Sequence, residues 1–108
     1  MNINMNVVVA EMMSAIKGSM ANDWPLVRSS VDAYFNLRKQ RLELLASMRI
    51  SNQISEEFFN LRIHDEKSIL ESEMHSINVM SKVMAQNAAN AAIDVFQKAV
   101  MAILKTVL

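Results

Sequence analysis

The chain contains one glycine and one proline among its 108 residues. A chain of average composition and this length would contain about eight glycines and about five prolines. Tight turns depend on these two residue types, so folds with many turns, such as β-sandwiches and β-barrels, are excluded. Glycine-rich nucleotide-binding loops are excluded for the same reason. The sequence therefore predicts a small all-α protein.

Composition also limits the function. The chain has no cysteine, which excludes disulfides, thiolate metal sites and cysteine nucleophiles. Its 11 basic and 11 acidic side chains give a net charge of zero, which disfavours binding to nucleic acid through bulk attraction. We find neither a classical signal peptide nor an apolar run of about 20 residues, so the cytoplasm is the default location. The length fits a single helical domain, 1–108.

The spacing of apolar residues and the capping residues divide the chain into four helical segments. Asp23 and Pro25 fit the cap and the first turn of one helix, and Ser55 fits the cap of the next. No glycine or proline follows Ser55, and only asparagine and alanine at 87–90 suggest a break. In an alternative interpretation, the last two predicted helices form one continuous helix. The predicted helices span about 7–20, 24–50, 55–86 and 91–108.

Helical phase locates the boundary between the second and third helices. If the second helix continued at 100° per residue, Ile54 and Leu61 would fall among its polar positions. A break at 51–53 removes this conflict, and replacing Asn52 with glycine should then be tolerated. The second helix is mainly basic and the third mainly acidic, which favours an antiparallel pair. The predicted fold is an antiparallel helical hairpin extended to a three- or four-helix bundle with a long C-terminal helix.

Two clusters of titratable side chains resemble chemical sites. The first cluster lies on one line of the third helix and consists of His64, Glu71, His75 and Lys82. Leu61 and Ser72 occupy the positions three residues before the histidines, where a di-iron bundle requires glutamate. The second cluster consists of Asp65, Glu66, Glu71 and Glu73. Such neighbouring acids point in different directions and are usually exposed, whereas catalytic carboxylates need contrasting environments. We therefore predict no enzyme, no metal site and no cofactor.

Basic residues and methionines each allow two interpretations. The basic residues at the centre and end of the second helix are Arg38, Lys39, Arg41 and Arg49. The acidic third helix beside them favours arginines with buried stems paired to its acids over a nucleic-acid surface. The ten methionines fit an ordinary core with soft packing, and the alternative is a methionine-lined groove for a partner helix.

The last predicted helix is apolar around most of its circumference. Its polar residues Asp94, Gln97, Lys98 and Lys105 share one narrow sector, so the helix is expected to be buried in an assembly or to lie in a membrane. Protein burial is favoured, because a membrane-surface helix would carry a more basic polar face. The second helix is too short to cover residues 82–108. We therefore predict a homo-oligomer with an interface formed by Ile93, Val95, Phe96, Ala99, Val100, Ile103, Leu104 and Val107.

These observations favour a non-catalytic structural or protein–protein interaction protein. It would self-assemble through apolar helical faces, as helical bundles and coiled coils do. The first alternative is an adaptor or small chaperone that binds a partner's amphipathic helix. The second is a membrane-associated helical protein. A nucleic-acid-binding regulator comes last.

Overall fold

The computed structural model describes residues 3–76 and 80–107, with the side chains of Ala21 and Val107 left out. The elements are α1 (Met5–Met20), the 3₁₀ turn η1 (Ala21–Asp23), α2 (Trp24–Ile50), α3 (Glu56–His75) and α4 (Lys82–Val107). No strand occurs within the described residues. The prediction of an all-α helical bundle is therefore confirmed.

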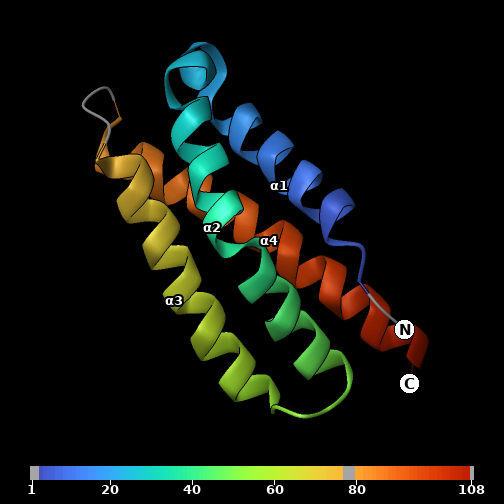
Figure 1. Ribbon diagram of the computed structural model, residues 1–108. Coiled ribbons are helices and arrows are strands. Elements are labelled where there is room, and N and C mark those ends of the chain that lie inside the picture. Colours follow the sequence, from blue (N-terminus) through green and yellow to red (C-terminus); the bar gives the residue numbers. More distant parts are fainter. Residues whose placement is uncertain (1–2, 77–79, 108) are drawn as a thin grey trace.

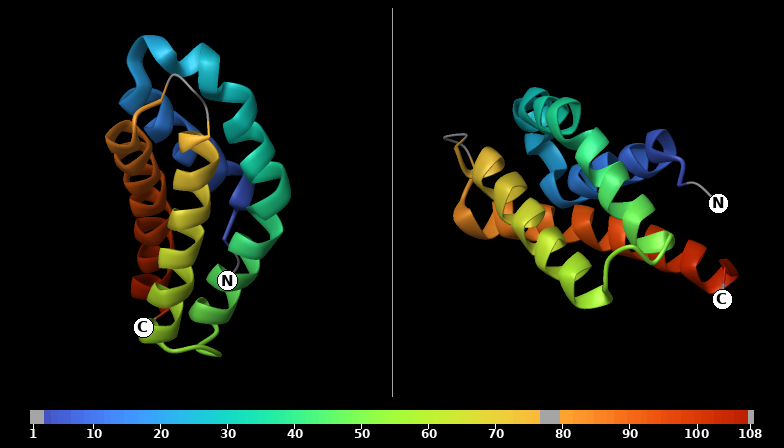
Figure 2. Two further views of the ribbon diagram at one scale, coloured as in Figure 1. Left: turned by 90° about the vertical axis from the view of Figure 1, so that its left-hand side faces the viewer. Right: turned by 60° about the horizontal axis from the view of Figure 1, so that its bottom comes forward.

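The four helices run alternately up and down and form a four-helix bundle (Figure 1). α1 and α3 each pack against both α2 and α4, and α2 also contacts α4 across the bundle. In Figure 2, left, α3 lies between α2 and α4. The bundle measures 43 × 23 × 20 Å, and its long dimension matches the length of about 40 Å expected for the 27 residues of α2.

The tightest pairing in the bundle is between α1 and α4. α1 buries one side, spaced three and four residues apart, which consists of Met5, Val8, Met12, Ile16 and Met20. α4 buries Ala85, Ala88, Ala89 and Ala92. Because alanine adds a single carbon, it lets long methionine side chains approach the backbone of α4 and fill the gaps between helices. The interpretation of the methionines as core residues therefore holds for these positions of α1.

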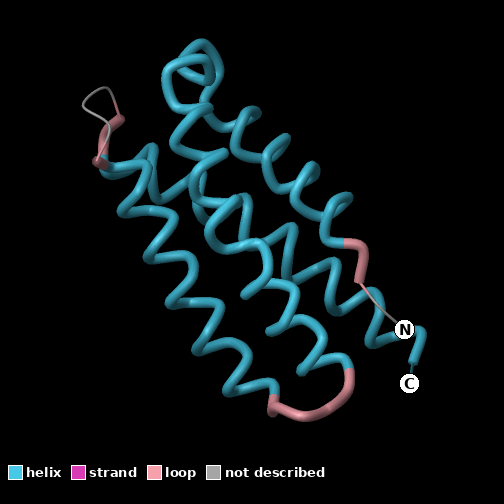
Figure 3. Tube along the Cα trace, viewed as in Figure 1, coloured by secondary structure: helices cyan, strands magenta, loops and turns pink. Residues whose placement is uncertain are grey.

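A short loop connects α2 to α3 (Figure 3), and its hydrogen bonds form a helix-ending motif followed by a helix cap. The backbone N–H of Asn52 donates to Arg49 and that of Gln53 donates to Met48, which is the Schellman pattern. Asn52 has a φ of 61°, the left-handed conformation that this motif requires. The N–H of Phe58 donates to the side-chain oxygen of Ser55 at 3.1 Å. The predicted break and the predicted Ser55 cap are both confirmed.

Substitution of Asn52 tests this turn. Asn52→Gly is expected to keep or raise the stability, because glycine adopts a positive φ without strain. Asn52→Val is expected to lower the free energy of unfolding by about 1–2 kcal/mol, because a β-branched residue is strained there. Urea unfolding followed by circular dichroism measures both changes. A loss of about 1 kcal/mol in the glycine variant would instead indicate a helical position.

Three details of the predicted helices are wrong. The break after α3 lies between His75 and Lys82, not at 87–90, and residues 77–79 lie outside the described part of the chain. Ser81 provides the signal for the new helix, since its side-chain oxygen accepts the N–H of Met84 at 3.1 Å. Asp23 precedes α2 but makes no capping hydrogen bond with its side chain. The third difference is at the start of α1, which begins two residues earlier than predicted.

The early break changes the surroundings of the last helix. Since α3 ends at His75, α4 folds back along both α3 and α1 instead of extending beyond them (Figure 1). The expectation that 82–108 lacks an intrachain partner is therefore wrong. Ile93, Phe96 and Val100 are buried in the bundle core. The remaining described residues of the predicted interface are half-buried, and they are Val95, Ala99, Ile103 and Leu104. The side chain of Val107 lies outside the described part.

Candidate binding surfaces

An ionic cluster around one buried carboxylate joins α2 to α3. Glu66 of α3 is 1% exposed, and both of its carboxylate oxygens are bound. Arg38 donates to them at 2.5 and 3.1 Å, and Arg41 lies 3.2 Å away. The hydroxyl of Tyr34 donates to the same carboxylate at 3.3 Å. The predicted pairing of arginines with the acids of the third helix is therefore present, with Glu66 as the shared partner.

The hydrogen bonds and ion pairs of this cluster link α2 to α3 and have a structural role. Burial, and then the negative charge of Glu66, raise the pKa of the Tyr34 phenol, so it stays protonated as a hydrogen-bond donor at neutral pH. The hydrogen bond to Glu66 raises the pKa of the Arg38 guanidinium. A carboxylate with every oxygen occupied and no opening to solvent is poorly placed to transfer protons to a substrate.

The other titratable candidates are dispersed. His64, His75 and Lys82 are exposed and Glu71 is half-buried. Within residues 3–76 and 80–107, no group of three or more histidine, aspartate or glutamate side chains is placed to hold a metal ion. Asp65 and Glu73 are exposed. Lys82 begins α4 and so leaves the line that the other three members of the first cluster keep on α3, and Glu66 is the one buried member of the second cluster.

Six of the large apolar side chains that the described structure leaves exposed belong to α2 and α3, the two helices of the hairpin. We call these residues the outer face: Leu26, Leu37 and Leu44 of α2 with Phe58, Leu61 and Ile69 of α3. Leu37 is the most open, with 79% of its surface accessible. Arg41 lies between Leu37 and Leu44 along α2. Arg41 pairs with Glu66 of α3, so the leucines on either side of Arg41 lie next to the contact between α2 and α3.

The α2 half of the outer face has the spacing of a coiled-coil seam. The line follows steps of seven, four, three, four and three residues, and it consists of Leu26, Ala33, Leu37, Gln40, Leu44 and Ser47. Every member is exposed and none carries a charge. Alternating steps of three and four residues place side chains along one stripe that a second helix can cover. The spacing of the leucines along α2 does not by itself reveal that they are left uncovered.

The α3 half of the outer face mixes apolar and charged groups. The guanidinium of Arg62 lies over the ring of Phe58, 5.3 Å from its centroid, and pairs with Asp65 at 3.2 Å. Leu61 is 61% exposed, although the break at 51–53 was expected to bring it out of the polar positions. The predicted break is correct, but the expectation that it would bury Leu61 is wrong, because Leu61 lies on the solvent side of α3.

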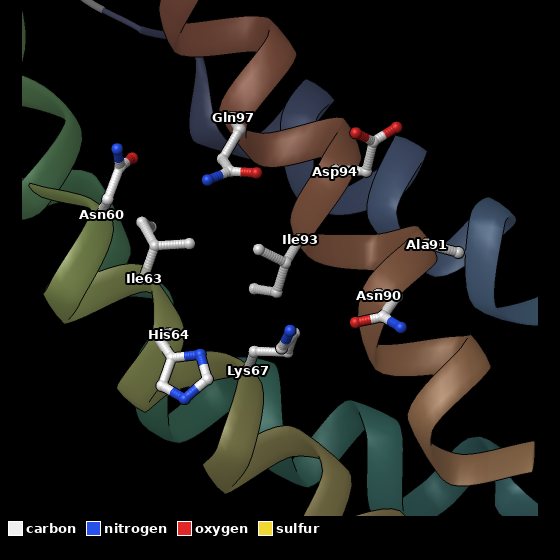
Figure 4. A pocket seen from close by; sticks show the side chains of 9 residues that line it. All are labelled: Asn60, Ile63, His64, Lys67, Asn90, Ala91, Ile93, Asp94 and Gln97. Carbon is white, nitrogen blue, oxygen red and sulfur yellow. The ribbon is translucent and has the colours of Figure 1, made fainter. Parts of the chain in front are cut away.

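A groove runs along the opposite side of α3, between α3 and α4. It consists of two adjoining hollows of about 550 and about 510 Å³, which share Asn60, Asp94 and Gln97. In Figure 4, Ile63 and Ile93 approach each other across the first hollow, with polar side chains around them. The second hollow continues past Phe59 and Val100 to its end. The groove therefore has an apolar floor and a polar rim, which suits binding of an amphipathic segment.

Comparison of the chain with protein-family models, curated proteins and solved structures finds no match. Among the described helices, none is long and apolar enough to cross a membrane.

Proposed function

We propose that the protein is a non-catalytic interaction protein that self-associates through its outer face. The observation that carries this proposal is the uncharged, exposed seam of α2 centred on Leu37. Large apolar side chains that recur along one face of a helix mark an interface more often than single exposed apolar residues do. The predicted self-assembly is thus retained as a proposal, with its surface moved from residues 91–108 to α2 and α3.

A second copy of the chain fits this surface. In a twofold dimer the same patch faces itself, so it must be complementary to its own chemistry. The line of leucine, alanine, glutamine and serine meets that condition along its own length, because none of its members carries a charge. Packing α2 against α2 would cover Leu26, Leu37 and Leu44 from both copies, as in a coiled coil.

We propose a non-catalytic role because the titratable side chains are either paired with one another or at least partly exposed to solvent. The one buried carboxylate among the described residues, Glu66, is occupied by Arg38, Arg41 and Tyr34. The other acids and histidines of the two sequence clusters are exposed or half-buried. Catalytic sites instead gather titratable groups with contrasting environments in a cleft.

The variant Leu37→Glu tests self-association. A glutamate at the centre of the seam faces its own copy in a twofold dimer, so we expect the dissociation constant to rise by about tenfold or more. The fold should be unaffected, because the side chain is exposed. The matched control is Asn87→Glu, which adds the same charge at an exposed position of α4. Sedimentation equilibrium of both variants gives the masses, and equal masses for the two would contradict the proposal.

A further inference from the structure

We propose that the groove between α3 and α4 is a docking site for an acidic amphipathic helix of another protein. The groove lies on a different side of α3 from the outer face, so this site is separate from self-association. Its occupant follows from the length of the groove, its floor and the charges on its rim.

The length of the groove corresponds to a short helix. Its lining on α4 runs from Asn90 to Lys105. Fifteen residues at 1.5 Å each give about 22 Å. A partner helix of about 15 residues, or four turns, would therefore lie along the whole groove.

The apolar surface of the groove that is open to a partner lies mainly at its Met101 and Leu104 end, because Ile63, Ile93 and Phe59 are no more than 5% exposed. Ile63 and Ile93 line the first hollow, and Phe59, Met101 and Leu104 line the second. Met101 is 52% exposed, so an incoming side chain can still reach it. Helix-in-groove complexes use apolar residues at positions i, i+3, i+4 and i+7 of the bound helix. The methionine-lined groove considered from the sequence is thus represented here by one methionine.

The rim selects the charge of the partner. Arg49, Lys67 and Lys105 line the groove, and none of them has an ion-pair partner among the described residues. Asp94 is neutralised by Lys98 at 2.8 Å. Glu56, at the N-terminal end of α3, is the acid of the rim that remains without a cation. Three free cations against one free anion favour a helix with carboxylates flanking its apolar stripe.

The same charges argue against other occupants. A second copy would offer its outer face, but the α2 seam carries no carboxylate to meet the rim, and Asp65 on the α3 half is already paired with Arg62. An anionic membrane would match the charge, but a flat surface cannot follow the hollow between α3 and α4 in which the half-buried Leu104 lies. A helix matches both the charge and the concave shape.

The test uses two fluorescein-labelled synthetic helical peptides of 16 residues. Both carry leucine at positions i, i+3, i+4, i+7 and i+11, and they differ only in having glutamate or lysine at the flanking positions. Fluorescence anisotropy measures their binding to the full chain. We expect the acidic peptide to bind at least about tenfold more tightly than the basic one, and more weakly as salt rises.

Variants place the peptide in the groove. The double variant Lys67→Glu with Lys105→Glu should weaken binding of the acidic peptide by about tenfold or more and strengthen binding of the basic peptide. Lys17→Glu with Lys82→Glu makes the same change in net charge at two exposed positions outside the groove, and it should have little effect. Leu37→Glu should also have little effect, which separates this result from self-association. Equal affinities for the two peptides, no effect of the groove variants, or binding to phosphatidylserine vesicles without binding to either peptide would each overturn the proposal.

Discussion

Phe96→Ala is expected to lower the free energy of unfolding by about 3–5 kcal/mol. Phe96 lies in the middle of α4 and is fully buried, and its ring stacks on that of Phe59 with centroids 6.1 Å apart. Removing the ring loses its transfer free energy and leaves a cavity in close-packed surroundings. Since small domains have only about 5–15 kcal/mol of stability, much of the total would be lost.

Urea unfolding followed by circular dichroism measures this loss. Met101→Ala is the control on the same helix, and we expect it to change the stability by less than about 1 kcal/mol, because Met101 is half exposed. The effect of Phe96→Ala distinguishes a core position in the bundle from a position at an interface between copies of the chain. If residues 91–108 formed an interface, the variant would have a lower oligomeric mass in solution but an unchanged free energy of unfolding. That outcome would contradict the placement of α4 in the core.

Replacing Arg38 and Arg41 together by methionine is expected to cost about 3–5 kcal/mol of stability. The buried carboxylate of Glu66 would then keep only the Tyr34 hydroxyl as a side-chain partner. An unpaired charge in a low-dielectric interior is strongly unfavourable, whereas the stems of the two methionines still cover apolar surface. Thermal and urea unfolding of the double variant measure the effect.

The control for this prediction removes the charge as well. Adding Glu66→Leu to the two methionine substitutions should recover most of the lost stability, because buried ion pairs can be replaced by apolar groups of similar volume at little cost. Tyr34 keeps the backbone carbonyl of residue 66 as an acceptor at 3.4 Å. If the triple variant were as unstable as the double variant, the loss would come from packing and not from the unpaired carboxylate.

The α2–α3 hairpin could be predicted because its signals are local. Ser55 stands where a cap is needed, and Asn52 is one of the few residue types that tolerate a left-handed backbone. The break after α3 has weaker local signals. The apolar stripe keeps its phase from Met74 to Met84 and Ala88, so the spacing alone gives no conflict that would reveal the end of a helix. Only Ser81 marks the new start.

The binding surfaces depend on packing between helices, which sequence spacing does not specify. Leu37 and Leu42 both belong to the broad apolar half of α2, yet Leu42 is fully buried and Leu37 is exposed. Which side is covered depends on where α1, α3 and α4 lie. Glu66 is likewise one of several acids in its helix, and only the arginines and the tyrosine across the hairpin distinguish it.

The most direct test of self-association is the mass of the unmodified chain in solution. Sedimentation equilibrium between about 1 and about 100 micromolar separates a self-associating chain from a monomer, because association depends on concentration. We predict a mass that rises with concentration towards twice 12.2 kDa or a higher multiple. A folded, soluble chain whose mass stays at 12.2 kDa over the whole range would contradict the proposal.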